Sequence, residues 1–318
     1  FAYAALQKAL ALRSSASPRE QAYINALSTR YIENYDFEKR RSQDEAYAEA
    51  MAELATSYPD DLDAITLYAD ALFLLEERRG YRDLTNPRVI RIHNILEGVR
   101  ARDVQHPFAC HLYIHATEST TEPGKAEICT EFMGNVIPGA SHLNHMPSHT
   151  WNEIGRWGDS VRANLQAWHT DQKAAFGEGV AIYPTHNLQM LLFAASMDGQ
   201  GAIAMQAGKD LSKLNGNSLF QLLTLLRFGR FEEILQVTER PDADYPAGVW
   251  DFAQGYALLK SGETEFARAH LARLGAMADT TEAMFRFDPA SRLLSVMHGI
   301  LEGEIHWQDG NLRRAIRA

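Results

Sequence analysis

Cysteine is scarce in this sequence, and long apolar runs are missing. Cys110 and Cys129 are the two cysteines among 318 residues, and they do not form a Cys-x-x-Cys pair. Neither a disulfide framework nor a cysteine-based zinc site is therefore expected, and we predict that both thiols are reduced. The most apolar stretch, from Met190 to Met197, is far shorter than the roughly 20 residues of a membrane-spanning helix. We expect no membrane span and a soluble chain.

Clusters of basic residues are also missing. The net charge is −10, and the 31 Lys and Arg residues are scattered along the chain. Binding to the phosphates of a nucleic acid needs such residues gathered in one patch, so we exclude nucleic acid as a partner. The hydrophobic fraction of 46% and the charged fraction of 23% are those of globular proteins, which predicts a buried core.

Both ends of the sequence fall inside helical patterns. The chain opens at Phe1 within one such pattern and closes at Ala318 in the middle of another. We therefore expect that natural terminal segments are missing, and a signal peptide would belong to the segment before Phe1. Without such a segment, the cytoplasm is the default compartment.

Apolar residues recur at the spacing of an α-helix, and alternating strand patterns of useful length are absent. Tyr47, Met51 and Leu54 form one apolar stripe, and a second, more buried helix is predicted over residues 62–75. Residues 57–61, which include a proline and two aspartates, supply the turn between them. The fold class predicted from this periodicity is all-α.

A short sequence motif that begins with glycine recurs along the chain. It occurs at residues 155–161, 229–234, 262–267 and 310–316, where the glycine precedes a stretch of spaced apolar residues. We predict that each glycine forms the turn between the two helices of a hairpin. The interval between the second and third of these glycines is 33 residues, whereas the other intervals are irregular.

In this pattern the chain resembles, from end to end, a degenerate form of the tetratricopeptide-repeat family, whose period is about 34 residues. The resemblance implies one α-α superhelix, or solenoid, of roughly six helix pairs over residues 1–318. Residues 61–200 would be histidine-rich metal-site repeats, and residues 201–318 would be degenerate C-terminal repeats. The first helices of the pairs would line an inner surface that carries the function, and segment 76–86 is expected to form a loop over it.

Eight of the 12 histidines crowd into one quarter of the chain. They are His106, His111, His115, His142, His145, His149, His169 and His186. In the motif HLYIH, His111 and His115 are four residues apart and lie one above the other on a helix face, and Glu118 continues that face. Imidazoles bind Zn, Cu, Fe and Ni, and a carboxylate one turn later is commonly a third ligand or a hydrogen-bond partner of a ligand.

The second motif, HLNHMPSH, gives His145 and His149 the same spacing, with His142 one turn earlier. The ring of Pro147 clashes with the carbonyl of residue 143 in a continued helix. We therefore expect the helix to start near Asn144 and His142 to lie on a bent entry, as a further candidate ligand.

The two motifs stand one repeat apart. His111 and His145 are separated by 34 residues, and so are His115 and His149. Equivalent helices of stacked repeats lie side by side at about 8–10 Å, a distance that two imidazole side chains can bridge. We therefore predict that both pairs converge on one metal site.

Two further candidate ligands come from neighbouring repeats. His186 lies in a Tyr-Pro-Thr-His-Asn sequence, 37 residues after His149 and near the expected start of a helix. Asp70 occupies, one repeat earlier, the position that His115 occupies in its own repeat. We predict that His186 is a ligand and that Asp70 is either a ligand or the acceptor of an imidazole N–H.

Together these motifs resemble a subgroup of tetratricopeptide-type proteins that carry HLYIHA, then HMPSH with a Gly-Arg-aromatic turn, then a Tyr-Pro-His-Asn element. They stand here at residues 111–116, at 145–149 with 155–157, and at 183–187, where Thr185 is inserted before the histidine. The resemblance implies a shared histidine site and no particular reaction.

The leading hypothesis is a metal-dependent enzyme that holds one or two ions of copper, iron or zinc. It would act on a small organic substrate by oxidation or by hydrolysis, and the residue types do not choose between them. Two alternatives stay open: a scaffold for a protein partner, with histidines for recognition or pH sensing, and a metal-binding protein without catalysis. Isolated histidines such as His93 and His270 are expected to pack or to form hydrogen bonds, and His106, before Pro107, to mark a helix boundary.

Overall fold

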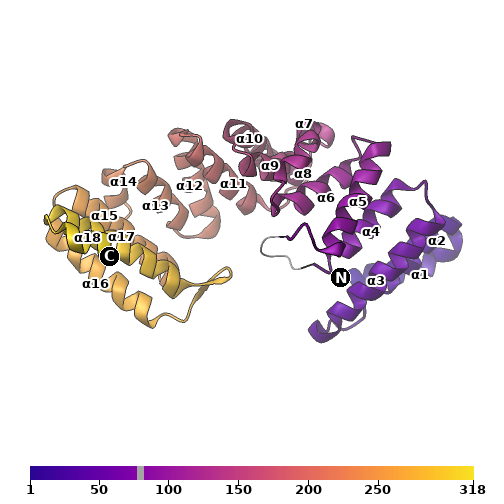
Figure 1. The fold of residues 1–318 in the computed structure, drawn as a ribbon, viewed down its shortest axis with the longest axis horizontal. Coiled ribbons are helices and arrows are strands. Elements are labelled where there is room, and N and C mark those ends of the chain that lie inside the picture. The colour runs from indigo at the N-terminus through magenta and orange to yellow at the C-terminus, as the bar shows by residue number, and fades with distance from the viewer. Residues whose placement is uncertain (77–81) are drawn as a thin grey trace. The chain divides into compact units, whose positions relative to one another are not determined.

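The computed structural model describes residues 1–76 and 82–318, and nearly all of its regular structure is helical (Figure 1). The all-α prediction is confirmed. The chain divides into two compact units, Phe1–Ile182 and Tyr183–Ala318. Of the loop predicted over residues 76–86, residues 77–81 lie outside the described part, and the residues that follow them up to 86 are not helical.

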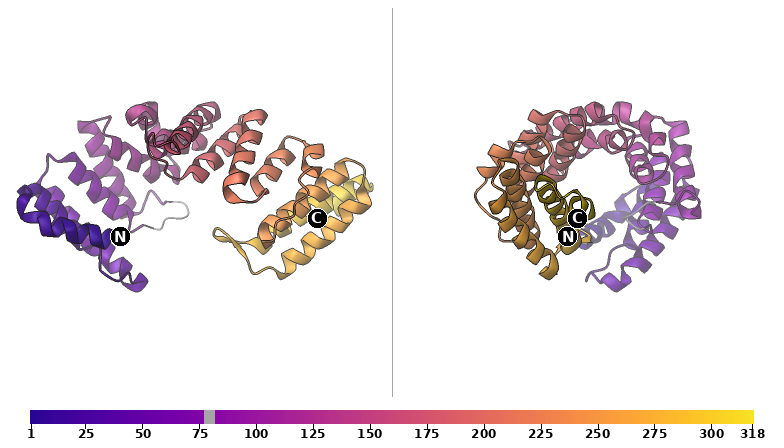
Figure 2. Two further views of the ribbon diagram at one scale, coloured as in Figure 1. Left: turned by 180° about the vertical axis from the view of Figure 1, so that it is seen from behind. Right: turned by 60° about the vertical axis from the view of Figure 1, so that its left-hand side comes forward.

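The first unit contains ten α-helices and two short 3₁₀ turns among its described residues. They are α1 (Ala2–Leu12), η1 (Arg13–Ser15), α2 (Pro18–Ser28), α3 (Phe37–Ser57), α4 (Leu62–Phe73), α5 (Pro87–Arg102), α6 (Pro107–Glu118), η2 (Pro123–Ala126), α7 (Glu127–Val136), α8 (Ser141–His145), α9 (Pro147–Glu153) and α10 (Trp157–Ala174). Successive helices from α2 to α6 pack side by side (Figure 2). Their shared core is built from buried apolar side chains such as Met51, Ile92 and Leu96.

Helix boundaries in this unit follow their capping residues. The predicted turn at residues 57–61 lies between α3 and α4, and the side chain of Asp61 accepts a hydrogen bond from the amide of Ala64. His106 caps α6 in the same way, with its Nδ1 accepting from the amide of Ala109, and Pro107 takes the first helical position. The predicted boundary role of His106 is confirmed.

The second unit contains α11 (Pro184–Met197), α12 (Gly201–Asn215), α13 (Leu219–Arg227), α14 (Phe231–Leu235), α15 (Asp244–Lys260), α16 (Thr264–Thr280), α17 (Ala290–Gln308) and α18 (Leu312–Arg317), with the hairpin of β1 (Met284–Phe285) and β2 (Asp288–Pro289) before α17. Neighbouring helices pack on one another, and alternate helices also touch: α11 packs on α13, α13 on α15, and α15 on α17. The apolar core of this unit includes Val249, Leu274 and Leu301.

All four predicted glycine turns join consecutive helices. Gly155, Gly229, Gly262 and Gly310 have φ values between 64° and 87°, in the left-handed region that favours glycine. In each turn the residue after the glycine donates its amide to the carbonyl five residues earlier, as in a Schellman motif. A fifth turn of the same kind, at Gly199 between α11 and α12, was not predicted from the sequence.

The prediction of reduced cysteines is wrong. Cys110 in α6 and Cys129 in α7 form a disulfide, with their Cα atoms 5.3 Å apart and both side chains fully buried. The turn that contains η2 folds α7 back onto α6, so two cysteines separated by 19 residues meet. A rule based on short spacing along the chain does not detect such a pair.

Among the described residues, every helix is too short or too polar to span a membrane.

Candidate metal centre

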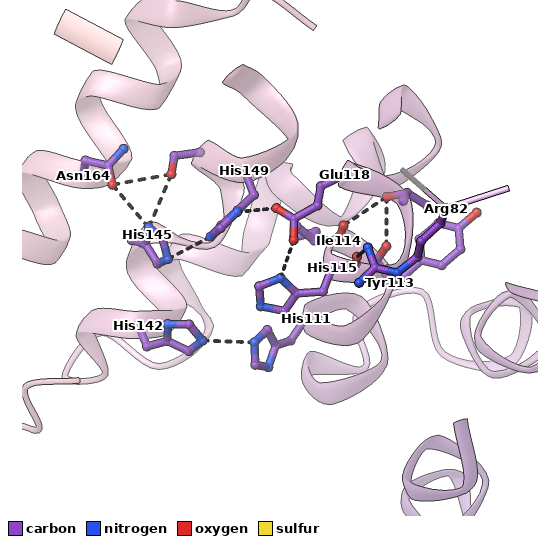
Figure 3. A network of polar contacts seen from close by, with 12 residues as sticks. Arg82, His111, Tyr113, Ile114, His115, Glu118, His142, His145, His149 and Asn164 are labelled. Atoms are coloured by element: carbon purple, nitrogen blue, oxygen red, sulfur yellow. Dashed lines mark hydrogen bonds and ion pairs between the residues drawn. The ribbon is translucent and has the colours of Figure 1, made fainter. Parts of the chain in front are cut away.

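Three helices of the first unit bring the predicted histidines together. α6 carries His111 and His115 with Glu118 at its last position, α8 carries His142 and His145, and α9 carries His149 (Figure 3). α6 packs against α9, so the two motifs face each other. We call these five histidines the five-histidine cluster.

The break between α8 and α9 differs from the sequence prediction. The helix begins at Ser141 rather than near Asn144, and Pro147 is the first residue of a second short helix. Met146 keeps helical angles, φ −50° and ψ −40°, so the chain changes its hydrogen bonding at Pro147 without a large change of direction. His142 therefore lies within one turn of His145.

The imidazoles of the five-histidine cluster form a closed circuit. In the order His111, His142, His145, His149, His115, successive ring centroids are 5.0, 5.3, 4.7 and 5.1 Å apart, and His115 returns to His111 at 5.1 Å. The predicted convergence of the first and second motifs is therefore present in the structure. Burial of five imidazoles against one another costs free energy unless they share a ligand or a charged hydrogen-bond partner.

Glu118 joins two of the rings by their Nδ1 atoms. One carboxylate oxygen is 2.8 Å from Nδ1 of His115, and the other contacts Nδ1 of His149 (Figure 3). A carboxylate that accepts hydrogen bonds from two Nδ1–H groups fixes both tautomers and directs the Nε2 lone pairs away from itself. Glu118 thus orients two imidazoles with both of its oxygens engaged.

A neutral pair of side chains orients His145. Its Nδ1 is 3.3 Å from Oδ1 of Asn164 in α10, and the hydroxyl of Ser148 lies close to both groups. The amide of Asn164 donates to the carbonyl of Ser160, which leaves Oδ1 as the acceptor for the Nδ1–H of His145. His145, which is fully buried, therefore also directs Nε2 into the cluster.

The Nε2 atoms meet in two close pairs. Nε2 of His111 is 3.1 Å from Nε2 of His142, and Nε2 of His145 is 3.1 Å from Nε2 of His149. In the pair of His111 and His142, a neutral Nε2–H of one ring can donate to the other ring. In the pair of His145 and His149, whose Nδ1 atoms face Asn164 and Glu118, two Nε2 lone pairs repel each other unless a positive charge lies between them. That charge can be a proton or a metal ion.

Burial and repulsion by the neighbouring imidazoles disfavour the protonated, charged form of His111. Burial is the main cause that lowers the pKa of His111 to about 3, and the neighbouring His115, His142 and His149 lower it further. Burial would raise the pKa of Glu118, but hydrogen bonds from His115 and His149 outweigh it and hold that pKa well below its usual range. At neutral pH the cluster thus combines an ionised carboxylate with an uncharged His111, as metal binding requires.

The donor atoms fit a transition metal. One nitrogen atom from each of His111, His115 and His142 lies within 4.8 Å of the other two, and so do single ligand atoms of His115, Glu118 and His149. Neutral imidazole nitrogens suit copper, zinc, iron and nickel, whereas magnesium and calcium prefer oxygen. The described residues could therefore hold a metal ion.

The two remaining predicted ligands belong to α4 and α11. Asp70 is in α4, near Tyr47. Burial raises the pKa of Tyr47 to about 12, and the negative charge of Asp70 contributes to this rise. It belongs to no group of metal-ligand atoms formed by the described residues. His186 lies in the first turn of α11, at the beginning of the second unit. Its role as a ligand stays a prediction.

Asn164 and Arg82 support the site, and neither was predicted from the sequence. Asn164 follows His145 by 19 residues on another helix, and no spacing rule connects them. Arg82 donates its backbone amide to Ser119 and its guanidinium to the carbonyl of His115, which holds the end of α6 in place. His93, by contrast, is a buried hydrogen-bonding residue as predicted, with Nε2 at 3.1 Å from the carbonyl of Ala116.

Comparison with known proteins finds no family model that matches this chain and no curated protein similar enough to count as a relative.

Proposed function

We propose that this chain binds a transition metal through the five-histidine cluster and is a metal-dependent enzyme that acts on a small organic substrate. The contact between Nε2 of His145 and Nε2 of His149 carries the proposal. Because Glu118 and Asn164 hold the Nδ1 atoms of these two rings, the contact places two lone pairs together, and a metal ion satisfies both.

Copper, iron and zinc are the candidate metals, and the helices that present the histidines are proposed to form a tetratricopeptide-like superhelix. A bound ion with an open coordination position would supply either Lewis acidity for hydrolysis or redox chemistry for oxidation. His186 and Asp70 remain proposed ligands or hydrogen-bond partners at this site. The chain's own contribution is to direct the Nε2 atoms and to keep His111 uncharged.

Metal analysis of the purified full chain tests metal binding. The protein is stripped with a chelator, reloaded separately with Cu(II), Zn(II) and Fe(II), desalted and analysed for metal and protein. We expect at least one ion per chain and loss of that ion in the double variant His115→Ala, His149→Ala. The matched control is His298→Ala, His306→Ala in the second unit, which removes two histidines and should keep the metal. Absence of metal after reloading would overturn the proposal.

Catalysis needs a separate measurement. The loaded protein, the loaded control and the double variant are compared on chromogenic phenols for oxidation and on chromogenic esters for hydrolysis. We expect turnover in the first two samples and none in the third. Metal binding without turnover on either substrate class would favour a metal-binding protein without catalysis, and no metal binding at all would favour a protein scaffold.

A further inference from the structure

The five-histidine cluster contains two pairs of facing Nε2 atoms rather than one central meeting point. We infer that the centre holds two metal ions per chain, one at the pair His111 and His142 and one at the pair His145 and His149. This second ion site rests on the proposed function, because both ions need the same cluster. His115 lies between the pairs, with its ring centroid 5.1 Å from His111 and 5.1 Å from His149.

The separation within each pair fits one ion. Two nitrogen ligands at about 2.0–2.1 Å from a tetrahedral ion are about 3.3 Å apart. The Nε2 atoms are 3.1 Å apart both in the pair His111 and His142 and in the pair His145 and His149. Each pair therefore has nearly the separation that two ligands take on a shared ion, and neither pair needs the other to reach it.

The space between the pairs is too wide for one ion to serve both. Within the first unit, the groups of ligand atoms that fall within 4.8 Å of one another are His111, His115 and His142, and His115, Glu118 and His149. Neither group contains a member of both Nε2 pairs. The rings of His142 and His145 also have centroids 5.3 Å apart, the widest step of the circuit.

The role of Glu118 strengthens the division. Its two oxygens contact Nδ1 of His115, which lies between the pairs, and Nδ1 of His149, which belongs to one of them. A single carboxylate thereby couples the two ion sites while both sets of metal ligands are imidazole nitrogens. Two ions in adjacent positions can act together on one small oxygen ligand, such as hydroxide or dioxygen.

Copper titration of the chelator-stripped full chain distinguishes one ion from two. We expect Cu(II) to bind until two ions are held per chain. The variants His142→Ala and His145→Ala remove one ligand from each pair, and each is expected to retain one ion. The control is His306→Ala, which should bind two. Circular dichroism and thermal unfolding establish that each variant is folded, and His142→Ala carries the test if the buried His145→Ala variant does not fold.

Electron paramagnetic resonance gives a readout that does not depend on activity. Two neighbouring Cu(II) ions couple magnetically, so the integrated signal of the wild type should fall below its copper content. In His142→Ala the signal should equal the copper content, because one isolated ion remains. A wild type that saturates at one ion, with full signal, would overturn this inference and leave metal binding intact. Binding of no copper would overturn both.

Discussion

A carboxylate in each unit accepts hydrogen bonds from several nitrogen groups, and the two networks differ in their charges. In the second unit, fully buried Asp251 accepts hydrogen bonds from Arg240, Arg273 and His270 at 2.9–3.0 Å. In the first unit, the direct partners of Glu118 are the imidazoles of His115 and His149. Permanent cations neutralise Asp251, whereas Glu118 faces rings that can lose their charge.

The difference indicates which network is complete without a ligand. Burial would raise the pKa of Asp251, but its hydrogen bonds to His270, Arg273 and Arg240 outweigh burial and lower that pKa. Every charge in that network has a partner in the protein. Around Glu118, Nε2 of His149 faces Nε2 of His145, and a proton or a metal ion between these two atoms would remove the repulsion of their lone pairs. We therefore interpret the Asp251 network as structural and the Glu118 network as a ligand site.

The largest difference expected between the two units is the stabilisation of the first unit by a bound metal ion. At a free metal concentration a thousand times the Kd, binding stabilises the folded state by about 4 kcal/mol. We expect this gain in the first unit, as slower hydrogen exchange of α6, α8 and α9 after Zn(II) is added, and no change in α15 and α16. The measurement is hydrogen exchange followed by mass spectrometry. Equal protection in both units would contradict the assignment of the metal to the Glu118 network.

The second largest effect is expected from removal of Asp251. Asp251→Ala leaves three nitrogen groups without their shared acceptor, and we expect it to lower the free energy of unfolding by about 3 kcal/mol, a value tempered by the partial exposure of both arginines. Denaturant unfolding measures the loss, and metal stoichiometry should not change. The control Asp279→Ala, on an exposed position of α16, should stay within about 0.5 kcal/mol of the wild type.

Sequence patterns predicted most of the features that depend on local chain geometry, such as the turns between helices. The glycine motif predicted turns at Gly155, Gly229, Gly262 and Gly310, because a left-handed residue after a helix is a local requirement. Gly199 was missed although Ile203 follows it at the same distance as Phe266 follows Gly262. The division into two units depends on contacts summed over many helices, and no linker marks it in the sequence.

The candidate site was predictable where it follows the repeat interval. The 34-residue offset indicated that His115 and His149 would face each other, and their ring centroids are 5.1 Å apart. The partner of His111 could not be predicted in this way, because the same offset pairs His111 with His145, whereas His142, one turn earlier, lies opposite it. The disulfide was missed for a related reason, since it depends on how tightly the turn after α6 folds back.

A substitution at Glu118 tests whether this carboxylate, unlike Asp251, orients metal ligands. We expect Glu118→Gln to weaken metal binding 10–100-fold, about 1.4–2.7 kcal/mol, because one Nδ1–H loses its acceptor and both lose a negative charge. Isothermal titration with Zn(II) measures the affinity and the number of ions. The control Glu122→Gln, beyond the end of α6, should bind as the wild type does. Loss of a whole ion, rather than weaker binding of the same number, would show that Glu118 is itself a ligand.

Acid is expected to act on the metal-free protein through His111. Its pKa is about 3 in the folded chain and about 6.5 when unfolded, so between these values the unfolded chain binds a proton that the folded chain does not. Stability from this group is therefore present above pH 6.5 and is lost as pH falls, at a rate that approaches about 1.4 kcal/mol per pH unit. Denaturant unfolding between pH 6.5 and 5 should show this slope, and His111→Gln should reduce it. An unchanged slope in the variant would contradict the burial of an uncharged imidazole.

The smallest change in metal affinity is expected from the loss of Asn164, a neutral residue that orients His145. Asn164 holds His145 at 3.3 Å, a longer contact than the 2.8 Å between Glu118 and His115, so its loss should cost less. We expect Asn164→Ala to weaken metal binding about tenfold or less, with the number of ions unchanged in a Zn(II) titration. The exposed control Gln206→Ala should have no effect.

The substitution Asn164→Asp then converts the neutral network at His145 into one like that of Glu118. A carboxylate at this position would accept the same Nδ1–H and make His145 a stronger donor to the metal, so affinity should rise above that of the wild type. The metal-free variant should be less stable, because the new charge is buried without a permanent cation of the kind that Asp251 has. A variant that gains stability without metal would mean that a proton already separates Nε2 of His145 from Nε2 of His149, since that proton would supply the missing positive charge.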